Sequence, residues 1–198
     1  PNQYMAAYLT FESQAKKADE WAVYLDECRR VVFPDSTPEN PHVGVDVRPL
    51  DVNLSEEDFA VVFEDGEPRT NVNGHVRFGL QAIKGISADG ITSIVATRRE
   101  GGAFRSIHDF CERIDHSKVN QKALELLIRA GTFDGIHGVD ARAALLQALP
   151  QVYRAGRNLS MDRQAGQNML FGGESGEAKV APEVVLPLSL IHISEPTR

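Results

Sequence analysis

The chain has 198 residues, of which 42% are hydrophobic and 25% are charged, as is ordinary for a globular protein. Two cysteines exclude a disulfide scaffold, and the lack of any apolar run of roughly 18 residues excludes a membrane span. The net charge of −7 is uneven: residues 1–77 carry 7 Lys/Arg and 15 Asp/Glu, whereas residues 78–134 carry 8 and 7. Any attraction to a polyanion is therefore expected to be local rather than a broad field. We expect a cytoplasmic setting, and the first residue, Pro1, indicates a fragment.

Residues 1–77 are predicted to form short helices and short strands. Trp21, Tyr24, Leu25 and Cys28 share one face of a helix at a spacing of three and four residues. Residues 34–42 hold three prolines and cannot continue that helix. We expect helices over residues 3–12 and 16–30, and strands over residues 43–47, 59–63 and 75–79, the last two joined by a polar loop with Asp65-Gly66 and Asn73-Gly74.

Residues 78–150 are predicted to be a series of short helices joined by glycine turns. A short helix should end at Ala82 and Ile83, before the turn. Ser87, Ser106 and Asn120 are suitable N-caps for three further helices, the first two over residues 88–99 and 107–114. The glycines at 101–102 and at 131 should end the first and third of these helices. A last helix should run from Arg142 to Leu149 and stop before Pro150.

The predicted fold class is α+β and mainly helical, with a small β-hairpin region followed by a tandem helix-hairpin-helix domain and a flexible C-terminal tail. Apolar periodicity fades beyond about residue 155, and Gly, Ser, Glu and Gln dominate residues 156–180. We therefore expect the domains to cover residues 1–77 and 78–150, with a tether over 151–187. Residues 188–198 resemble the translation of a sequencing adapter and are left out of fold arguments.

The bend at Lys84-Gly85-Ile86-Ser87 is the first candidate binding site. A glycine turn that leads into a helix presents free backbone N–H groups and a partial positive charge, which suit a phosphate and read no base. We expect Lys84 and the turn amides to contact nucleic acid, together with Arg98 and Arg99 if their end of the helix also faces it. The alternative is a helical hairpin used only for packing.

The bend from Ala130 to Gly135 is a second candidate hairpin. Asp134 in this bend would repel phosphate, so we expect this copy to be structural. Lys118 and Lys122 precede it, near the start of the helix that leads into the bend, and are candidate phosphate ligands. The alternative for both lysines is a solvated surface position.

Residues 167–171, Gln-Asn-Met-Leu-Phe, form an isolated hydrophobic cluster in a polar stretch. Such a cluster cannot build a core, but it suits a linear motif that folds into a partner's pocket. Gln167, Met169, Leu170 and Phe171 resemble the peptide that binds the bacterial sliding clamp. The alternative is that the cluster docks back onto its own domain.

Nothing in the sequence predicts catalysis or a metal site. The chain has no phosphate-binding P-loop and no His/Cys set with ligand spacing. Asp46 and Asp51 lie near a predicted strand, but no context supports a carboxylate pair that holds two metal ions. We therefore expect no catalytic residue and no metal ligand in this chain.

Taken together, many stretches resemble the alpha subunits of bacterial DNA polymerase III. The matching stretches are Tyr4-Met-Ala-Ala-Tyr-Leu-Thr10, Tyr24-Leu-Asp-Glu-Cys-Arg-Arg30, Arg48-Pro-Leu-Asp-Val-Asn53, Val76-Arg-Phe-Gly-Leu-Gln-Ala-Ile-Lys-Gly85, Arg98-Arg-Glu-Gly-Gly-Ala-Phe104, Phe110-Cys-Glu-Arg113, Val119-Asn-Gln-Lys-Ala-Leu-Glu125 and Ile128-Arg-Ala-Gly-Thr-Phe-Asp134. The resemblance covers nearly all of residues 1–172 in one order, which makes it more specific than any single motif.

The resemblance implies the end of a fingers domain, then a domain that holds duplex DNA, then a clamp-binding peptide. It implies double-stranded DNA, the sliding clamp and other subunits of the replicative holoenzyme as partners. The catalytic aspartates and Mg²⁺ of such a polymerase belong to a domain upstream, so this piece is expected to be inactive alone. Two rival hypotheses remain open: a helix-hairpin-helix module of a DNA-repair enzyme, and a protein-interaction module that touches no DNA.

Overall fold

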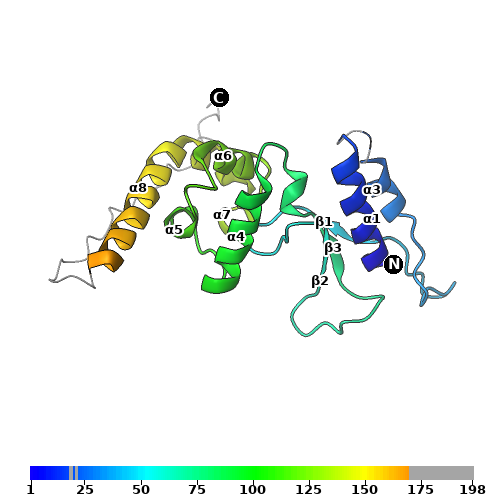
Figure 1. Ribbon diagram of the computed structural model, residues 1–198. Helices are drawn as coiled ribbons and strands as arrows, with labels where there is room; N and C mark the ends of the chain where they lie inside the picture. The colour runs from blue at the N-terminus through cyan, green and yellow to red at the C-terminus, as the bar shows by residue number, and fades with distance from the viewer. Residues whose placement is uncertain (18–19, 21, 170–198) are drawn as a thin grey trace, which may run out of the picture. The chain divides into compact units, whose positions relative to one another are not determined.

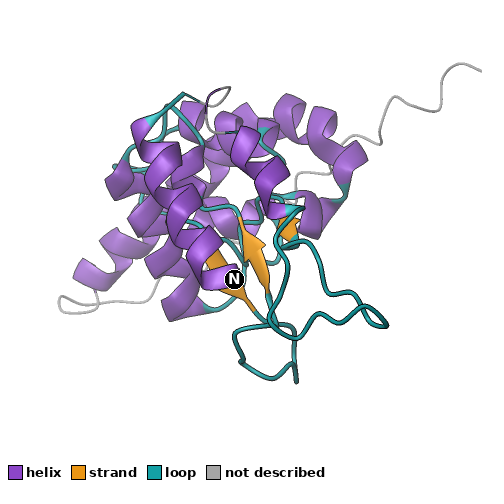
Figure 2. Ribbon diagram, turned by 90° about the vertical axis from the view of Figure 1, so that its right-hand side faces the viewer, coloured by secondary structure: helices purple, strands orange, loops and turns teal. Residues whose placement is uncertain are grey.

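The computed structural model describes residues 1–17, 20 and 22–169, with residues 164–169 described by their backbone alone. The chain forms two compact units, Pro1–Lys84 and Gly85–Arg198 (Figure 1). Helices predominate and the strands are confined to one small sheet (Figure 2), which confirms the mainly helical α+β class. Within the described residues, no helix combines the length and apolarity needed to cross a bilayer.

The first unit is built on a three-stranded sheet. Its strands are β1 (Val47–Arg48), β2 (Ala60–Val62) and β3 (His75–Arg77), in the order β1-β3-β2. β2 and β3 pair antiparallel, as a hairpin does, whereas β1 pairs parallel to β3. Val47 and Val61 both pair with Val76, so the three valines share one face of the sheet. The predicted strand over residues 43–47 is wrong in its bounds, since β1 begins where that strand was expected to end.

The described residues of the first unit also form two α-helices, α1 (Asn2–Ala15) and α3 (Val23–Cys28), and a short 3-10 helix, η1 (Leu80–Ala82). α1 packs against β2 and β3. The shared core comprises Met5, Ala6, Leu9, Cys28, Phe33, Val45, Phe59 and Val76. The helix predicted over residues 16–30 is shorter than expected among the described residues, and Trp21 lies outside them. Burial of the apolar faces of α1 and the sheet is what holds this unit together.

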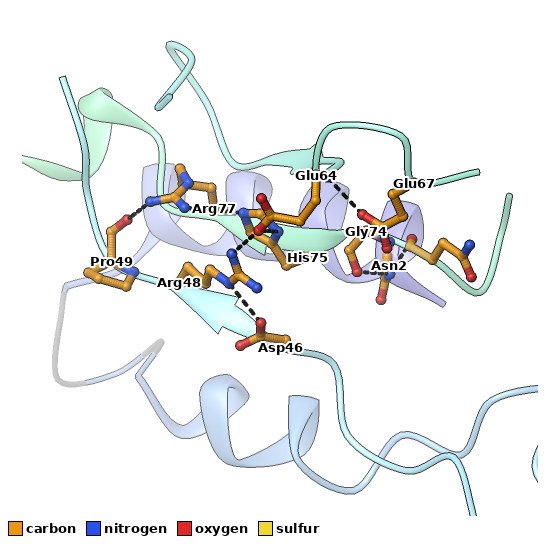
Figure 3. Close-up of polar contacts among 10 residues, drawn as sticks. Asn2, Asp46, Arg48, Pro49, Glu64, Glu67, Gly74, His75 and Arg77 are labelled. Carbon is orange, nitrogen blue, oxygen red and sulfur yellow. Dashed lines mark hydrogen bonds and ion pairs between the residues drawn. The ribbon is translucent and has the colours of Figure 1, made fainter. Parts of the chain in front are cut away.

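A polar network lies beside the apolar core of the first unit (Figure 3). Arg48 donates to Asp46 (Nε to Oδ2, 2.8 Å) and to Glu64. Arg77 donates from Nη1 to the carbonyl of Pro49 at 3.0 Å, and its Nη2 lies 3.2 Å from Nε2 of His75. Because a guanidinium only donates, Nε2 of His75 must accept, so this imidazole is neutral.

The second unit contains five helices among its described residues. They are α4 (Ala88–Gly101), α5 (Ile107–Arg113), α6 (Gln121–Arg129), α7 (Asp134–His137) and α8 (Arg142–Met169). The three predicted N-caps are confirmed. Ser87, Ser106 and Asn120 accept hydrogen bonds from the backbone N–H groups of Gly90, Asp109 and Ala123 at 3.1, 3.1 and 2.8 Å.

The core of the second unit is centred on three phenylalanines. The ring of Phe110 packs edge-on against Phe104 and Phe133, with centroids 4.9 and 5.1 Å away. α8 packs against α5 and α6, and a Cβ placed on Gly156 would lie 2.6 Å from the backbone of Cys111. The Tyr153 hydroxyl donates to the carbonyl of Val119 at 2.9 Å. These contacts bring α8 close to the helices that precede it.

The prediction that the last helix stops before Pro150 is wrong, because α8 continues to Met169. A proline inside a helix costs about 3 kcal/mol. The residues on either side of it, Leu149, Val152 and Tyr153, are buried, and their packing offsets that cost. Residues 156–169, expected to be flexible, are therefore helical. Leu170, Phe171 and residues 188–198 lie outside the described residues, and so do the side chains of Gln167 and Met169.

We predict that replacing His75 with Gln makes the first unit less sensitive to acid. Burial, followed by the charges of Arg48 and Arg77, lowers the pKa of His75 from its usual 6.5. The unfolded chain therefore takes up a proton at a higher pH than the folded chain, and stability falls as the pH drops below about 6.5.

A glutamine can still accept from Arg77 but does not titrate. The free energy of urea unfolding should therefore fall less between pH 7 and 5 in the variant than in the wild type. An NMR titration should place the midpoint of the His75 ring below 6.5. A midpoint above that value would contradict the prediction.

Candidate nucleic-acid interface

The first bend owes its shape to Gly85. This residue has φ +94°, a conformation that L side chains rarely adopt, and a Cβ at this position would lie 3.0 Å from Cδ1 of Leu126. The chain then becomes extended at Ser87, which caps α4. Glycine at 85 therefore allows both the turn and the close approach of α6.

The backbone N–H groups of residues 85–89 are open at this bend. The backbone N–H of Gly90 donates to the Ser87 hydroxyl, and that of Ile91 donates to the Ser87 carbonyl. The backbone N–H groups of residues 85–89 have no hydrogen-bond acceptor in the described part of the chain. Gly85 and Ser87 are exposed. Such groups at the start of a helix carry a partial positive charge and can bind an anion. The carboxylate of Asp89 in the first turn offsets part of that charge.

The structure brings two of the predicted lysines to this bend. A Cβ on Gly90 would lie 2.9 Å from the carbonyl oxygen of Lys118, so the loop before α6 packs on the first turn of α4. Lys122 lies one helical turn before Leu126, the residue that contacts Gly85, on the same face of α6. Both lysines are exposed, and within the described residues the ammonium of Lys118 has one long contact, of 3.8 Å, to the carboxylate of Asp115.

The other predicted cations lie elsewhere. Lys84 closes the first unit, where its ammonium donates to the carbonyl of Ser13 at 3.2 Å. Arg98 is only 8% exposed, which leaves little of it for an external phosphate, whereas Arg99 is exposed. Both arginines lie in the last turn of α4, roughly 15 Å along the helix from the bend. They do not form one site with the open amides.

The second bend differs because most of its backbone N–H groups are paired among the described residues. Gly131, with φ +81°, donates to the carbonyl of Ile128 at 3.0 Å, and Thr132 donates to that of Leu127 at 3.2 Å. These two bonds end α6 in a Schellman motif. Asp134 donates from its backbone to the Gly131 carbonyl at 3.1 Å. This bend consequently resembles a helix stop more than an anion site.

Arg142 is the partner of Asp134, a pairing that the sequence does not predict. Its Nε donates to Oδ1 of Asp134 at 2.8 Å, and its Nη2 donates to Oδ2 of the same carboxylate. The two residues are eight positions apart and separated by α7 and a short 3-10 helix, η2 (Val139–Ala141). No helical spacing connects them, so only the fold shows that the acid in the second bend is neutralised.

Arg113 binds carbonyl groups at the C-terminal end of α4, a role that the sequence does not predict. Its Nη2 donates to the carbonyls of Thr97 and Gly102 at 3.0 and 2.8 Å, and its guanidinium lies 4.6 Å from the centroid of the Phe104 ring. Carbonyl groups at a helix end lack partners within the helix, and a cation there satisfies them. Arg113 therefore has a structural role.

Metal chemistry finds no support in the described part of the chain. His, Cys, Asp and Glu side chains do not gather there in threes in a way that could hold a metal ion. Asp46 is paired with Arg48, and Asp51 accepts from the backbone N–H groups of Asn53 and Leu54 at 2.7 and 3.2 Å. The described side chains therefore form no carboxylate cluster of the kind that holds the Mg²⁺ ions of a polymerase.

A match to a known protein family identifies the helical hairpins of this chain. A family profile described as a helix-hairpin-helix motif matches residues 44–144, which is about half of the chain. The chain belongs to the helix-hairpin-helix family. The match includes both bends.

Curated relatives resemble most of this chain. The helix-hairpin-helix chain is 34% identical to the DNA polymerase III subunit alpha of Caulobacter vibrioides over 179 residues, which is 90% of this chain and 13% of that protein. The subunits of the same name from Haemophilus influenzae and Deinococcus radiodurans are also 34% identical, over 87% and 88% of this chain. The resemblance to DNA polymerase III alpha subunits is thus confirmed. The chain spans 11–13% of the length of these relatives.

We predict that Gly85→Ala destabilises the second unit by about 1–2 kcal/mol, because it adds backbone strain and a close contact with Leu126. Gly102→Ala is a matched control: its φ is +77°, but a Cβ there would meet nothing within 4 Å. Urea unfolding followed by circular dichroism should show a larger loss for the change at 85. Equal losses would mean that the contact with Leu126 contributes nothing.

Proposed function

We propose that this chain is a part of a bacterial DNA polymerase III alpha subunit that holds the backbone of duplex DNA without regard to sequence. The observation that carries the proposal is the row of open N–H groups at residues 85–89, next to Lys118 and Lys122. Backbone amides and lysines can bind phosphate oxygens but read no base edge. Helix-hairpin-helix membership and the polymerase relatives support the same conclusion.

The predicted DNA-contacting residues differ in their exposure and in the group that each offers to a phosphate. Gly85, Ile86 and Ser87 contribute amides, while Lys118 and Lys122 contribute charge. Lys84 and Arg99 remain as outer contacts, since each is exposed. Arg98 is no longer proposed as a DNA contact, because a side chain that is 8% exposed offers little surface to a phosphate.

The whole protein would be a DNA-directed DNA polymerase of the cytoplasm that uses Mg²⁺ and works with other holoenzyme subunits. Its chemistry would depend on residues outside this chain, so the 198-residue chain alone should not extend a primer. Within it, the role of the second unit is to grip the duplex and so keep the enzyme on its product.

We also propose that residues 167–171 attach the protein to the sliding clamp. Leu170 and Phe171 would anchor in a pocket of the clamp, and Gln167 would add a polar contact. The supporting feature is the pattern itself, whose first three residues are the last three of α8.

The repair-enzyme hypothesis uses the same hairpins, and the sequence that flanks this chain would separate the two. The catalytic aspartates of a polymerase in the upstream sequence would favour the polymerase hypothesis, whereas a nuclease or ligase site would favour the repair-enzyme hypothesis. The protein-interaction hypothesis predicts that charge removal at the bend leaves duplex affinity unchanged.

We predict that the double variant Lys118→Gln, Lys122→Gln binds a random duplex less tightly and with weaker salt dependence. Each lost phosphate contact should lower the slope of log affinity against log salt by about one. The matched control is Arg29→Gln, Arg30→Gln, which removes two exposed cations from the first unit.

Fluorescence anisotropy over a salt series measures both quantities. The control variant should bind like the wild type. Strong preference for one base sequence, or affinity that is independent of salt, would contradict a grip on the backbone.

We predict that Leu170→Ala with Phe171→Ala abolishes capture of this chain by an immobilised sliding clamp, because both anchors are lost. Val184→Ala with Val185→Ala removes an apolar pair from the same C-terminal stretch and should leave capture intact. Retained capture by the first variant would remove the clamp from the proposal while leaving the DNA grip untouched.

A further inference from the structure

Most backbone N–H groups of the second bend are paired among the described residues, and the bend also carries a guanidinium. A Cβ placed on Gly131 would lie 2.2 Å from Nη2 of Arg142 and 2.8 Å from Oδ2 of Asp134. The ion pair therefore packs directly against the glycine of the bend. Any side chain at 131 would displace it, so the bend and the position of Arg142 depend on each other.

Asp134 binds one edge of the Arg142 guanidinium. Asp134 accepts from Nε and from Nη2, and the described residues provide no acceptor for Nη1. The side chain of Arg142 is 40% exposed, against 23% for that of Asp134. Hydrogen bonding to Asp134 raises the pKa of Arg142, so its charge is permanent. The result is a fixed, partly exposed cation with free donors.

We propose that Arg142 is a contact to the sugar-phosphate backbone and that Asp134 positions its guanidinium for that contact. The first bend binds through main-chain amides; the second binds through this side chain instead. A guanidinium that is already held in place loses less conformational entropy when it binds phosphate. The inference rests on the proposed function, since it assumes that the second unit binds nucleic acid.

The spacing along α6 allows one duplex to meet both bends. Lys122 lies at the start of α6 and Gly131 just past its end, roughly 14 Å apart at 1.5 Å per residue. That length corresponds to about four steps along a strand at 3.4 Å each. One short duplex is long enough to contact both ends of α6.

The test compares three variants of the 198-residue chain on a random duplex over a salt series. Arg142→Gln removes the guanidinium, and Asp134→Asn keeps it but breaks the charged pair. Arg163→Gln is the control, because this arginine is 61% exposed and is also paired with a carboxylate, that of Glu112. Thermal melting of each variant reports the structural cost.

The expected result is that Arg142→Gln weakens binding about fivefold and lowers the salt slope by about one. Asp134→Asn should keep the slope, because the guanidinium is still present, and should weaken binding by less than Arg142→Gln, since the guanidinium only loses the carboxylate that holds it in place. The control should bind unchanged. If Arg142→Gln does not fold, the double variant Asp134→Asn, Arg142→Gln leaves a neutral hydrogen-bonded pair and should show the same loss of slope.

Two results would overturn the inference. One is an unchanged salt slope when Arg142 is replaced; the other is equal loss of affinity and melting temperature in Arg142→Gln and Asp134→Asn, which marks the pair as structural. If Lys118→Gln, Lys122→Gln weakens binding and Arg142→Gln does not, only this inference fails. If the wild-type chain binds no duplex, the proposed function fails with it.

Discussion

The open N–H groups at residues 85–89 are the feature on which the functional argument depends. A helix must begin somewhere, and its first amides have no partner within the helix. In this chain one of them is satisfied by the Ser87 hydroxyl, and those of residues 85–89 have no acceptor among the described residues. Glycine at 85 turns the chain away, and α6 passes close beneath it. The core of the second unit thus holds a row of donors in a fixed position.

The two bends pair their backbone N–H groups differently. Both turn on a glycine with positive φ, but only the second turns its amides back onto the preceding helix. The difference arises from what each bend joins. The first leads directly into α4, which supplies unpaired amides, whereas the second ends α6 and uses its donors to close that helix.

Net charge is a poor guide to binding in this protein because the acidic residues of the first unit are largely engaged in its own structure. Glu64 and Asp46 bind Arg48, and Glu67 accepts from the backbone of Gly74 and Glu64 at 2.7 and 2.8 Å (Figure 3). Carboxylates in such turns replace backbone acceptors that the loops lack. The balance of −7 therefore describes the chain as a whole and says little about the bend at Gly85.

The sequence alone determined the local structure: the helix caps at Ser87, Ser106 and Asn120, and the glycine stops. These depend on neighbouring backbone groups, which a short stretch of sequence specifies completely. Only the tertiary structure decided the continuation of α8 through Pro150, the burial of Arg98 and the pairing of Asp134 with Arg142. Each of these depends on packing between segments that are distant in the chain, and local propensity carries no information about such contacts.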